Sequence, residues 1–248
     1  MDYQLVIFDM DGTLTESRSP VDKEMSDLLC KLIAQKTVAI ISGGPFKQVQ
    51  EQVLNFLPRN QYSGNLHIAS LSGGSLHCFQ NGKWEKLYEL ELNPTEKQKI
   101  MSAFNKALEE TGFIAPEKVY GVLIEDRGDQ ITFSALGNEA PIELKKQWDP
   151  DHQKRAKIKQ SLEKYLPDYT IDIGGTTSID VRPKGIDKAY GIKKIAEHLS
   201  IPLDKVLFIG DAFYEGGNDY SVERLGIAAK NISGPAKAKE LIKEMLKI

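Results

Sequence analysis

The sequence lacks a large excess of charge of either sign, because 35 acidic residues are nearly balanced by 32 basic residues. A net charge of −3 gives no electrostatic reason to expect binding to nucleic acid or to an anionic membrane surface. No stretch reaches the roughly 18 apolar residues that a membrane-spanning helix needs, and no basic segment with a long apolar run opens the chain. We therefore expect a cytoplasmic protein that binds any anionic ligand through local groups.

Cysteine is also scarce. Cys30 and Cys78 are the only two cysteines, and they form no CxxC pair. Both lie within apolar patterns, so we expect reduced core residues, with a disulfide as the minor alternative. Hydrophobic residues make up 41% of the 248 residues, which is enough for one large domain or two modest ones.

Two acids follow a short apolar run near the start of the chain. Residues 5–8 are apolar without interruption, which predicts a strand buried on both faces inside a parallel sheet, and Asp9 and Asp11 come next. Alternation along a strand would put both carboxylates on one side, at the edge where open α/β sheets bind ligands. Their repulsion needs a cation, a shared proton or a phosphoryl group to offset it. The alternative is a strand followed by an ordinary Asp-Gly turn.

A second candidate site follows the expected strand at residues 37–41. The chain there reads Ser42-Gly43-Gly44-Pro45, and Pro45 suits the first position of a helix. A hydroxyl, two glycines and a helix N-terminus form a natural phosphate cradle, because unpaired N–H groups and the helix dipole point at the ligand. An ordinary strand-to-helix turn is the alternative.

The pattern of elements changes between residues 90 and 184. We expect a helix capped by Asn93, strands at 119–125 and 130–136, a charged loop at 139–146, a helix starting at Asp149-Pro150, and a hairpin of strands 171–173 and 178–181 around Gly174-Gly175. This αββαββ order predicts an inserted α+β domain with an antiparallel sheet at 90–184. Residues 1–89 and 185–248, where strands and helices alternate, predict an α/β, Rossmann-like parallel-sheet core.

The core resumes with a lysine and two further acids. Lys188 precedes an expected helix over 189–199, and an expected strand over 205–209 ends in Gly210-Asp211. Like Asp9, Asp211 is an acid at the carboxyl end of a buried strand. Gly216-Gly217-Asn218-Asp219 follows it. The plain alternatives are a solvated lysine for Lys188 and a helix N-cap for Asp219.

Together these pieces resemble the haloacid dehalogenase-like (HAD) phosphotransferases. The resemblance rests on Asp9-x-Asp11-Gly12-Thr13, Ser42, Lys188, Gly210-Asp211 and Asn218-Asp219. It implies that Asp9 is a nucleophile that accepts a phosphoryl group and that Asp11 is the general acid and base. It also implies that Ser42, Gly43 and Lys188 bind the phosphoryl oxygens. Mg²⁺ would be held by Asp9, Asp211 and the backbone carbonyl of Asp11.

A closer resemblance covers nearly the whole chain. The sequence is similar to the eukaryotic-type phosphomannomutases, HAD enzymes with a type IIB cap, in Asp9 to Thr15, Lys23-Glu24-Met25, Val49-Gln50-Glu51-Gln52, residues 173–181 and Gly216-Gly217-Asn218-Asp219. The resemblance implies that residues 90–184 form a substrate-specificity cap. It also implies that Ser178 and Asp180 bind sugar hydroxyls.

The chain departs from that family at its cap arginines, which bind the distal phosphate of a hexose bisphosphate. Arg127 matches one of them, but Tyr120 and Asn138 stand where two others are expected. Neither can form a bidentate, charge-assisted contact with phosphate. Arg182, with Lys184, either substitutes for the missing arginines or forms a solvated edge.

Two enzymatic hypotheses follow. The first is a Mg²⁺-dependent hexose-phosphate mutase that converts mannose 6-phosphate to mannose 1-phosphate, with a hexose 1,6-bisphosphate as activator. The second is a sugar-phosphate phosphatase, in which water attacks the aspartyl-phosphate; the missing arginines favour it. A noncatalytic binding protein is disfavoured because every catalytic position is filled. The expected partner is a small sugar phosphate, without nucleic acid or membrane, and a homodimer is left open.

Overall fold

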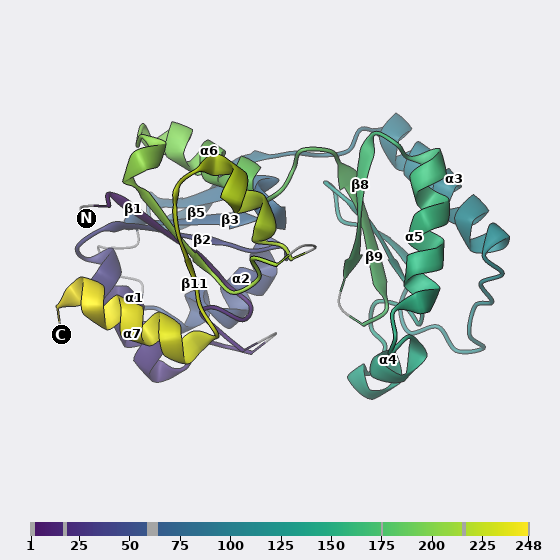
Figure 1. The fold of residues 1–248 in the computed structure, drawn as a ribbon, viewed down its shortest axis with the longest axis horizontal. Coiled ribbons are helices and arrows are strands. Elements are labelled where there is room, and N and C mark those ends of the chain that lie inside the picture. The colour runs from purple at the N-terminus through teal and green to yellow at the C-terminus, as the bar shows by residue number, and fades with distance from the viewer. Residues whose placement is uncertain (1–2, 17–18, 59–63, 175, 215–216, 248) are drawn as a thin grey trace. The chain divides into compact units, whose positions relative to one another are not determined.

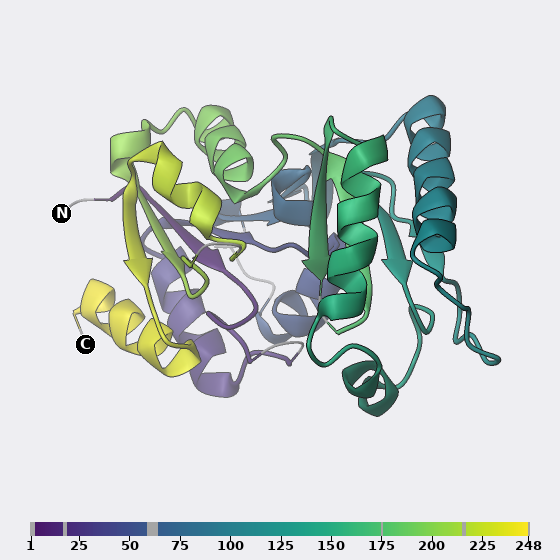
Figure 2. The same cartoon turned by 45° about the vertical axis from the view of Figure 1, so that its right-hand side comes forward.

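The computed structural model describes residues 3–16, 19–58, 64–174, 176–214 and 217–247. It divides into two compact units, one formed by Met1–Glu89 with Ile186–Ile248 and the other by Leu90–Gly185. Figures 1 and 2 show that each unit has its own sheet and its own helices. Within the described residues, no helix is long and apolar enough to cross a membrane. The predicted Gly175 and Gly216 lie outside the described residues.

The first unit is built on a seven-stranded sheet. Its strands are β1 (Leu5–Asp9), β2 (Thr37–Ile41), β3 (Leu66–Ser70), β4 (Ser75–Gln80), β5 (Lys83–Glu89), β10 (Val206–Gly210) and β11 (Ala228–Asn231). Their order is β11-β10-β1-β2-β3-β4-β5. The five strands from β11 to β3 are parallel, while β4 and β5 are added antiparallel. The α/β core predicted from the sequence is confirmed.

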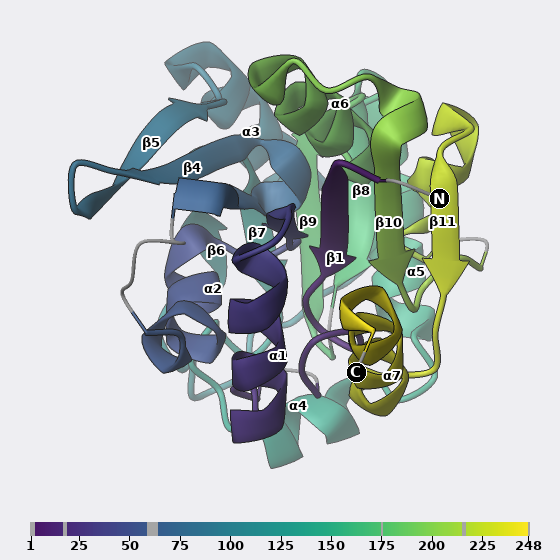
Figure 3. The ribbon, with the colours of Figure 1, turned by 90° about the vertical axis from the view of Figure 1, so that its left-hand side faces the viewer.

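Helices cover both faces of this sheet (Figure 3). They are α1 (Lys23–Ile33), α2 (Phe46–Gln52), α6 (Lys188–Leu199) and α7 (Pro235–Leu246). Val6 and Phe8 of β1 belong to the apolar cluster that includes α1 and α7, whereas Leu5 and Ile7 belong to the cluster that includes α6. Each such fully buried side chain stabilises the fold by about 1.5–3 kcal/mol. This two-sided burial explains why β1 is apolar without alternation.

Strand β1 lies between β10 and β2, with Asp9 paired to Ile41 in register. Because the carboxyl ends of parallel strands meet at one edge, the segments that follow β1, β2 and β10 come together there. This edge brings Asp9, Ser42 and Asp211 to the same end of the sheet.

The second unit has a four-stranded antiparallel sheet. Its strands are β6 (Ile124–Asp126), β7 (Ile131–Ser134), β8 (Tyr169–Gly174) and β9 (Ser178–Pro183), and its helices are α3 (Pro94–Glu110), α4 (Ile142–Trp148) and α5 (Gln153–Tyr165). The strand order is β6-β7-β9-β8. Phe133 and Ile179, which are cross-strand partners, share an apolar core with Phe104 of α3 and Leu162 of α5. The α+β character predicted for this part of the chain is confirmed.

Several local predictions are confirmed. Asn93 and Glu96 form the capping box at the start of α3, with Pro94 in its first turn. Positive φ angles at Asn81 and Gly82 make the tight hairpin turn between β4 and β5. Cys30 and Cys78 are free thiols; Cys78 is buried and Cys30 is half-buried.

Three local predictions in the second unit are wrong. The charged loop predicted at 139–146 overlaps α4, whose sequence has no apolar stripe to indicate a helix because none of its side chains is buried. The strand predicted at 119–125 is regular only as β6, from Ile124. Asp149 is not the N-cap of α5, which starts at Gln153, although its carboxylate accepts from the N–H of Lys154. The observed order thus has one helix more than αββαββ.

A glycine contact holds α6 against the loop that follows β3. Gly73 has a φ of +96°, and a Cβ on Gly191 would lie 2.7 Å from the Cα of Gly73 and 2.7 Å from Ile41 Cδ1. Because residue 191 has no side chain, the start of α6, which carries Lys188, packs directly against the loop beside Ser42.

We predict that Gly191→Ala lowers the free energy of unfolding by about 1–3 kcal/mol, the usual cost of overpacking. Alanine in place of a helical glycine ordinarily stabilises by about 0.5–1 kcal/mol, so the expected sign is the reverse of the helix propensity. Urea denaturation measures the change. Gly64→Ala is the control, because its nearest atom beyond the neighbouring residues is 3.9 Å away. Equal stability of Gly191→Ala and wild type would contradict the close contact.

Candidate active site

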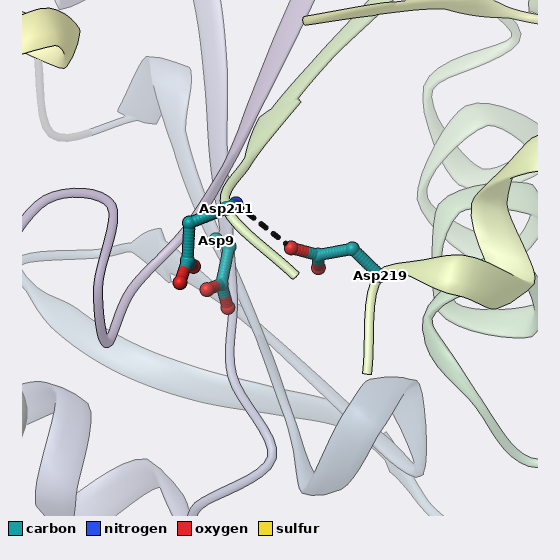
Figure 4. A group of neighbouring side chains, drawn as sticks. All are labelled: Asp9, Asp211 and Asp219. Carbon is teal, nitrogen blue, oxygen red and sulfur yellow. Dashed lines mark hydrogen bonds between the residues drawn. The ribbon is translucent and has the colours of Figure 1, made fainter. Parts of the chain in front are cut away.

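Three carboxylates gather at the carboxyl edge of the core sheet. Asp9 is the last residue of β1, Asp211 follows β10, and Asp219 comes eight residues later. One oxygen of each lies within 4.8 Å of the others. Figure 4 shows the carboxylates of Asp9 and Asp211 pointing the same way, while that of Asp219 turns to the backbone N–H of Asp211.

Lys188 balances part of this negative charge. Its Nζ donates to Asp9 Oδ1 at 2.5 Å and to Asp219 Oδ1 at 2.6 Å, and its side chain is 0% exposed. Lys188 is the first residue of α6, where the side chain of Asp187 caps the helix. The solvated-lysine alternative is therefore wrong. A buried lysine of this kind is stable only because two carboxylates pair with it.

Burial and charge act in opposite directions on the pair. Burial is the largest influence on Asp9, and with the nearby Asp219 it raises the pKa of Asp9 to about 7, against the effect of Lys188. Burial alone would lower the pKa of Lys188, but the charges of Asp9 and Asp219 outweigh it and raise that pKa. Lys188 is therefore a permanent cation of the site.

The free donor atoms of this edge fit a hard divalent cation. Asp9 Oδ2 is buried and accepts no hydrogen bond from the residues that the structure describes. Thr13 Oγ1 donates to Asp211 Oδ1 at 3.2 Å, and a Cβ on Gly12, whose φ is +84°, would lie 2.5 Å from Asp211 Oδ2. Glycine at residue 12 thus leaves room for the Asp211 carboxylate. Mg²⁺ prefers oxygen ligands, and carboxylate oxygens that accept no hydrogen bond, such as Asp9 Oδ2, suit it.

Asp219 makes contacts that the sequence did not predict. It is the N-cap residue of the 3₁₀ turn Tyr220–Leu225, as the alternative reading expected, but its side chain makes no capping hydrogen bond there. Its Oδ1 accepts from Lys188, and its Oδ2 accepts from the N–H groups of Asp211 at 3.0 Å and Ala212 at 2.9 Å. With both oxygens engaged, Asp219 positions Lys188 and the chain after β10, whereas Asp9 and Asp211 offer donor atoms to a metal.

The loop with Ser42 and Gly43 follows β2 directly. Ser42 Oγ accepts from the N–H of Gly44 at 3.1 Å, and the Ser42 carbonyl accepts from the N–H of Ser72 at 2.8 Å. Gly43 is exposed, and a Cβ there would meet only Ser72 Oγ, at 3.7 Å. Pro45 is the N-cap of α2 instead of its first residue, and α2 has only 7 residues, so the expected helix-dipole contribution is small. Phosphate binding by Ser42 and Gly43 stays a prediction.

Asp11 lies two residues beyond the end of β1 and is half-buried. Its Oδ2 accepts from Gln48 Nε2 of α2 at 3.1 Å. Sequence reasoning gave Gln48 no role. The signal available was its position one turn after the glycine loop, where a polar side chain can turn back to the sheet edge.

The second unit places Ser178 and Asp180 on one polar face of its sheet. Asp180 Oδ1 accepts from Thr132 Oγ1 at 2.6 Å and from Gln130 Nε2 at 3.3 Å. Ser178 Oγ lies 3.2 Å from Ser134 Oγ. Burial is the main reason why the pKa of Asp180 is raised. Asp180 Oδ2 has no hydrogen-bond partner within the described part of the chain, so it is available to a ligand hydroxyl.

Both predicted substrate arginines contact carboxylates. Arg127 donates from Nε and Nη2 to Glu125 Oε2, each at 2.8 Å, and Arg182 Nη2 lies 2.5 Å from Asp172 Oδ2. Burial raises the pKa of Asp180, and the positive charges of both arginines lower that pKa to a smaller extent.

The two positions where arginines were expected are structural instead. Asn138 Oδ1 accepts from the N–H of Val122 at 3.1 Å, and Tyr120 lies 4.7 Å from Lys118 Nζ, ring centroid to nitrogen. Neither brings a positive charge to the polar face.

We predict that Asp219→Asn destabilises the protein by about 1.5–3 kcal/mol, because Lys188 loses one charged hydrogen-bond partner and keeps only Asp9 as its counter-charge. An amide also cannot accept hydrogen bonds on both of its ends. Chemical denaturation measures this, with the exposed Asp204→Asn as control. A loss equal to that of the control would show that Asp219 does not hold Lys188.

Comparison with known proteins places the chain in a family. Residues 6–239 match the family model described as haloacid dehalogenase-like hydrolase. The phosphomannomutase of Saccharomyces cerevisiae is 32% identical over 224 residues, which cover 88% of this chain and 84% of the yeast protein. A Caenorhabditis elegans protein named probable phosphomannomutase is 26% identical over 251 residues, covering 98% of this chain and 95% of that protein.

Solved structures agree on the fold. N-terminally truncated Plasmodium falciparum IMP-nucleotidase aligns with a TM-score of 0.74 over 98% of this chain and 70% of that chain, at 18% identity, which shows likeness of fold alone. The family match, in contrast, runs through nearly the entire sequence and includes the residues of the acidic edge. This chain belongs to the haloacid dehalogenase-like hydrolase family.

Proposed function

We propose that this protein is a Mg²⁺-dependent phosphotransferase that acts on sugar phosphates through an aspartyl-phosphate at Asp9. The observation that carries the proposal is the environment of Asp9, a buried carboxylate that is paired with Lys188 on Oδ1 and has no hydrogen-bond donor at Oδ2 among the described residues. An anionic nucleophile can approach a phosphoryl group only where cations and oriented donors offset the repulsion.

The residues of the edge have separate roles in this reaction. A carboxylate oxygen of Asp9 attacks phosphorus, and the bond from phosphorus to the sugar oxygen breaks. Asp11 gives a proton to the departing sugar oxygen and later removes one from the group that accepts the phosphoryl. Lys188, Ser42 and the backbone at Gly43 neutralise and orient the phosphoryl oxygens. Mg²⁺, held by Asp9, Asp211 and the carbonyl of Asp11, supplies charge neutralisation when bound.

The acceptor defines the finer proposal, a mutase resembling phosphomannomutase that interconverts mannose 6-phosphate and mannose 1-phosphate. Relatives named phosphomannomutase match 88% and 98% of the chain. In this proposal residues 90–184 are a substrate-specificity cap in which Arg127, Ser178, Asp180 and Arg182 bind the sugar end. A hexose 1,6-bisphosphate serves as activator, because each cycle starts from a phosphorylated Asp9.

One observation favours a phosphatase as the second candidate. Arg127 and Arg182 each contact a carboxylate, and Tyr120 and Asn138 bring no charge, so a second phosphate would meet a face with little net positive charge. In a phosphatase, water takes the place of the sugar hydroxyl as acceptor. A homodimer and a cytoplasmic location stay predictions from the sequence.

We predict that Asp9→Asn reduces turnover by roughly 1,000-fold or more, as is usual when the nucleophile of an enzyme is replaced. The amide oxygen still accepts from Lys188, and Asp219 remains as the counter-charge of that lysine, so circular dichroism should show a folded protein. The exposed Asp27→Asn is the control, because its surface ion pair with Lys23 is worth only about 0.3–0.5 kcal/mol. Activity within tenfold of wild type, roughly 1.4 kcal/mol, would reject the covalent mechanism.

The products separate mutase from phosphatase. With mannose 1-phosphate and a hexose 1,6-bisphosphate, we predict mannose 6-phosphate as the main product and little inorganic phosphate. Arg127→Ala should slow isomerisation about 10- to 100-fold, the value of one or two hydrogen bonds to a charged group, and raise the share of free phosphate. Lys157→Ala, an exposed change in the same unit, is the control. Phosphate release without isomerisation in the wild type would favour the phosphatase.

A further inference from the structure

Gln48 makes a chain of two side-chain hydrogen bonds at the edge of the candidate active site. Its Nε2 donates to Asp11 Oδ2 at 3.1 Å and to Gln52 Oε1, one helical turn further on, at 3.2 Å. Gln52 is 7% exposed, and its backbone carbonyl accepts a hydrogen bond from the N–H of Val21. Gln48 is therefore held from behind by a buried partner and directs its second N–H to Asp11.

The chemistry of the partners settles which end of the Gln48 amide faces Asp11. An ionised carboxylate only accepts hydrogen bonds, so the contact with Asp11 requires the NH₂ group of Gln48. A flipped Gln48 amide would put its oxygen against a carboxylate oxygen of Asp11.

The glycine loop is built around the same side chain. A Cβ on Gly44 would lie 2.1 Å from Gln48 Oε1 and 2.8 Å from its Cδ. Any other residue at 44 would displace Gln48 from Asp11. The contact between Gln48 and Asp11 therefore depends on glycine at residue 44 in the loop that carries Ser42.

We infer that Gln48 is a positioning residue for Asp11, acting through the hydrogen bond from its Nε2 to Oδ2. The inference rests on the proposed function, in which Asp11 moves a proton to and from the sugar oxygen. The hydrogen bond to Oδ2 fixes the plane of the Asp11 carboxyl group, which is an orientational contribution to catalysis.

The choice of substrate gives the test its specificity. A sugar oxygen is a poor leaving group and needs the proton from Asp11, whereas nitrophenolate leaves from p-nitrophenyl phosphate without one. A residue that acts through Asp11 affects the sugar phosphate and spares p-nitrophenyl phosphate. A residue that merely stabilises the loop affects both substrates alike.

The experiment compares Gln48→Leu, Gln48→Glu and Gln48→Lys in the full chain with Mg²⁺, using mannose 1-phosphate plus a hexose 1,6-bisphosphate and, separately, p-nitrophenyl phosphate. Leucine removes the donor, glutamate puts an acceptor against Asp11, and lysine keeps a donor. Gln50→Leu and Gln50→Glu are matched controls, because Gln50 lies on α2 and has no hydrogen bond from its side chain within the described residues. The melting temperature is recorded for each variant.

We expect Gln48→Leu to lower kcat for the sugar phosphate about tenfold or more, a part of the roughly 100- to 10,000-fold that general acid–base catalysis contributes, with KM nearly unchanged. Gln48→Glu should lose more, Gln48→Lys should recover most of the loss, and turnover of p-nitrophenyl phosphate should stay near wild type. In an Asp11→Asn background, Gln48→Leu should have no further effect.

Two results would overturn the inference. One is equal kcat for Gln48→Leu and Gln50→Leu on the sugar phosphate, and the other is an equal loss on both substrates. Asp11→Asn separates this failure from that of the proposed function. If Asp11→Asn turns over the sugar phosphate at the wild-type rate, the role of Asp11 itself is wrong; if it is inactive while Gln48→Leu is normal, only the role of Gln48 is wrong.

Discussion

The ammonium group of Lys188 lies between the carboxylates of Asp9 and Asp219, and solvent reaches none of the three side chains to more than a small extent. Removing Lys188 would leave two buried carboxylates without a counter-charge, at a cost of about 3–5 kcal/mol. Asp219 in turn accepts the N–H groups of Asp211 and Ala212, which ties the lysine to the end of β10. The same interaction therefore holds the sheet edge together and leaves Asp9 Oδ2 open to a ligand.

The position of Lys188 depends on features far from it in the sequence. Helix α6 reaches the sheet edge because Gly191 contacts Gly73 without a side chain between them. In the loop after β3, the N–H of Ser72 donates to the carbonyl of Ser42. The same loop therefore contacts both α6 and the loop that carries Ser42. Gln48 of α2 contacts Asp11, and the missing side chain of Gly44 leaves room for it. Chemistry that needs cations and donors in fixed places can be built on such a rigid edge.

Much of the core could be predicted from the sequence because its signals are local. The uninterrupted apolar runs of β1, β2 and β10 indicate strands buried on both faces, and the acids at the ends of β1 and β10 predict a site at that edge. The capping box at Asn93 likewise needs only four residues. Helix α4 escaped prediction because it buries no side chain. The contacts of Asp219 and Gln48 escaped because they join residues distant in the chain, and no local pattern records which oxygen a donor meets.

We propose that a divalent cation held by Asp9 and Asp211 offsets the net negative charge that three carboxylates and one lysine leave at this edge. Isothermal titration calorimetry of Mg²⁺ into the wild type and into Asp211→Asn tests it most directly, because binding is read without turnover. The account predicts one saturable site in the wild type, with affinity lowered about tenfold or more in the variant, which corresponds to roughly 1.4 kcal/mol or more. Equal Mg²⁺ affinity in both proteins, or no binding to the wild type, would contradict it.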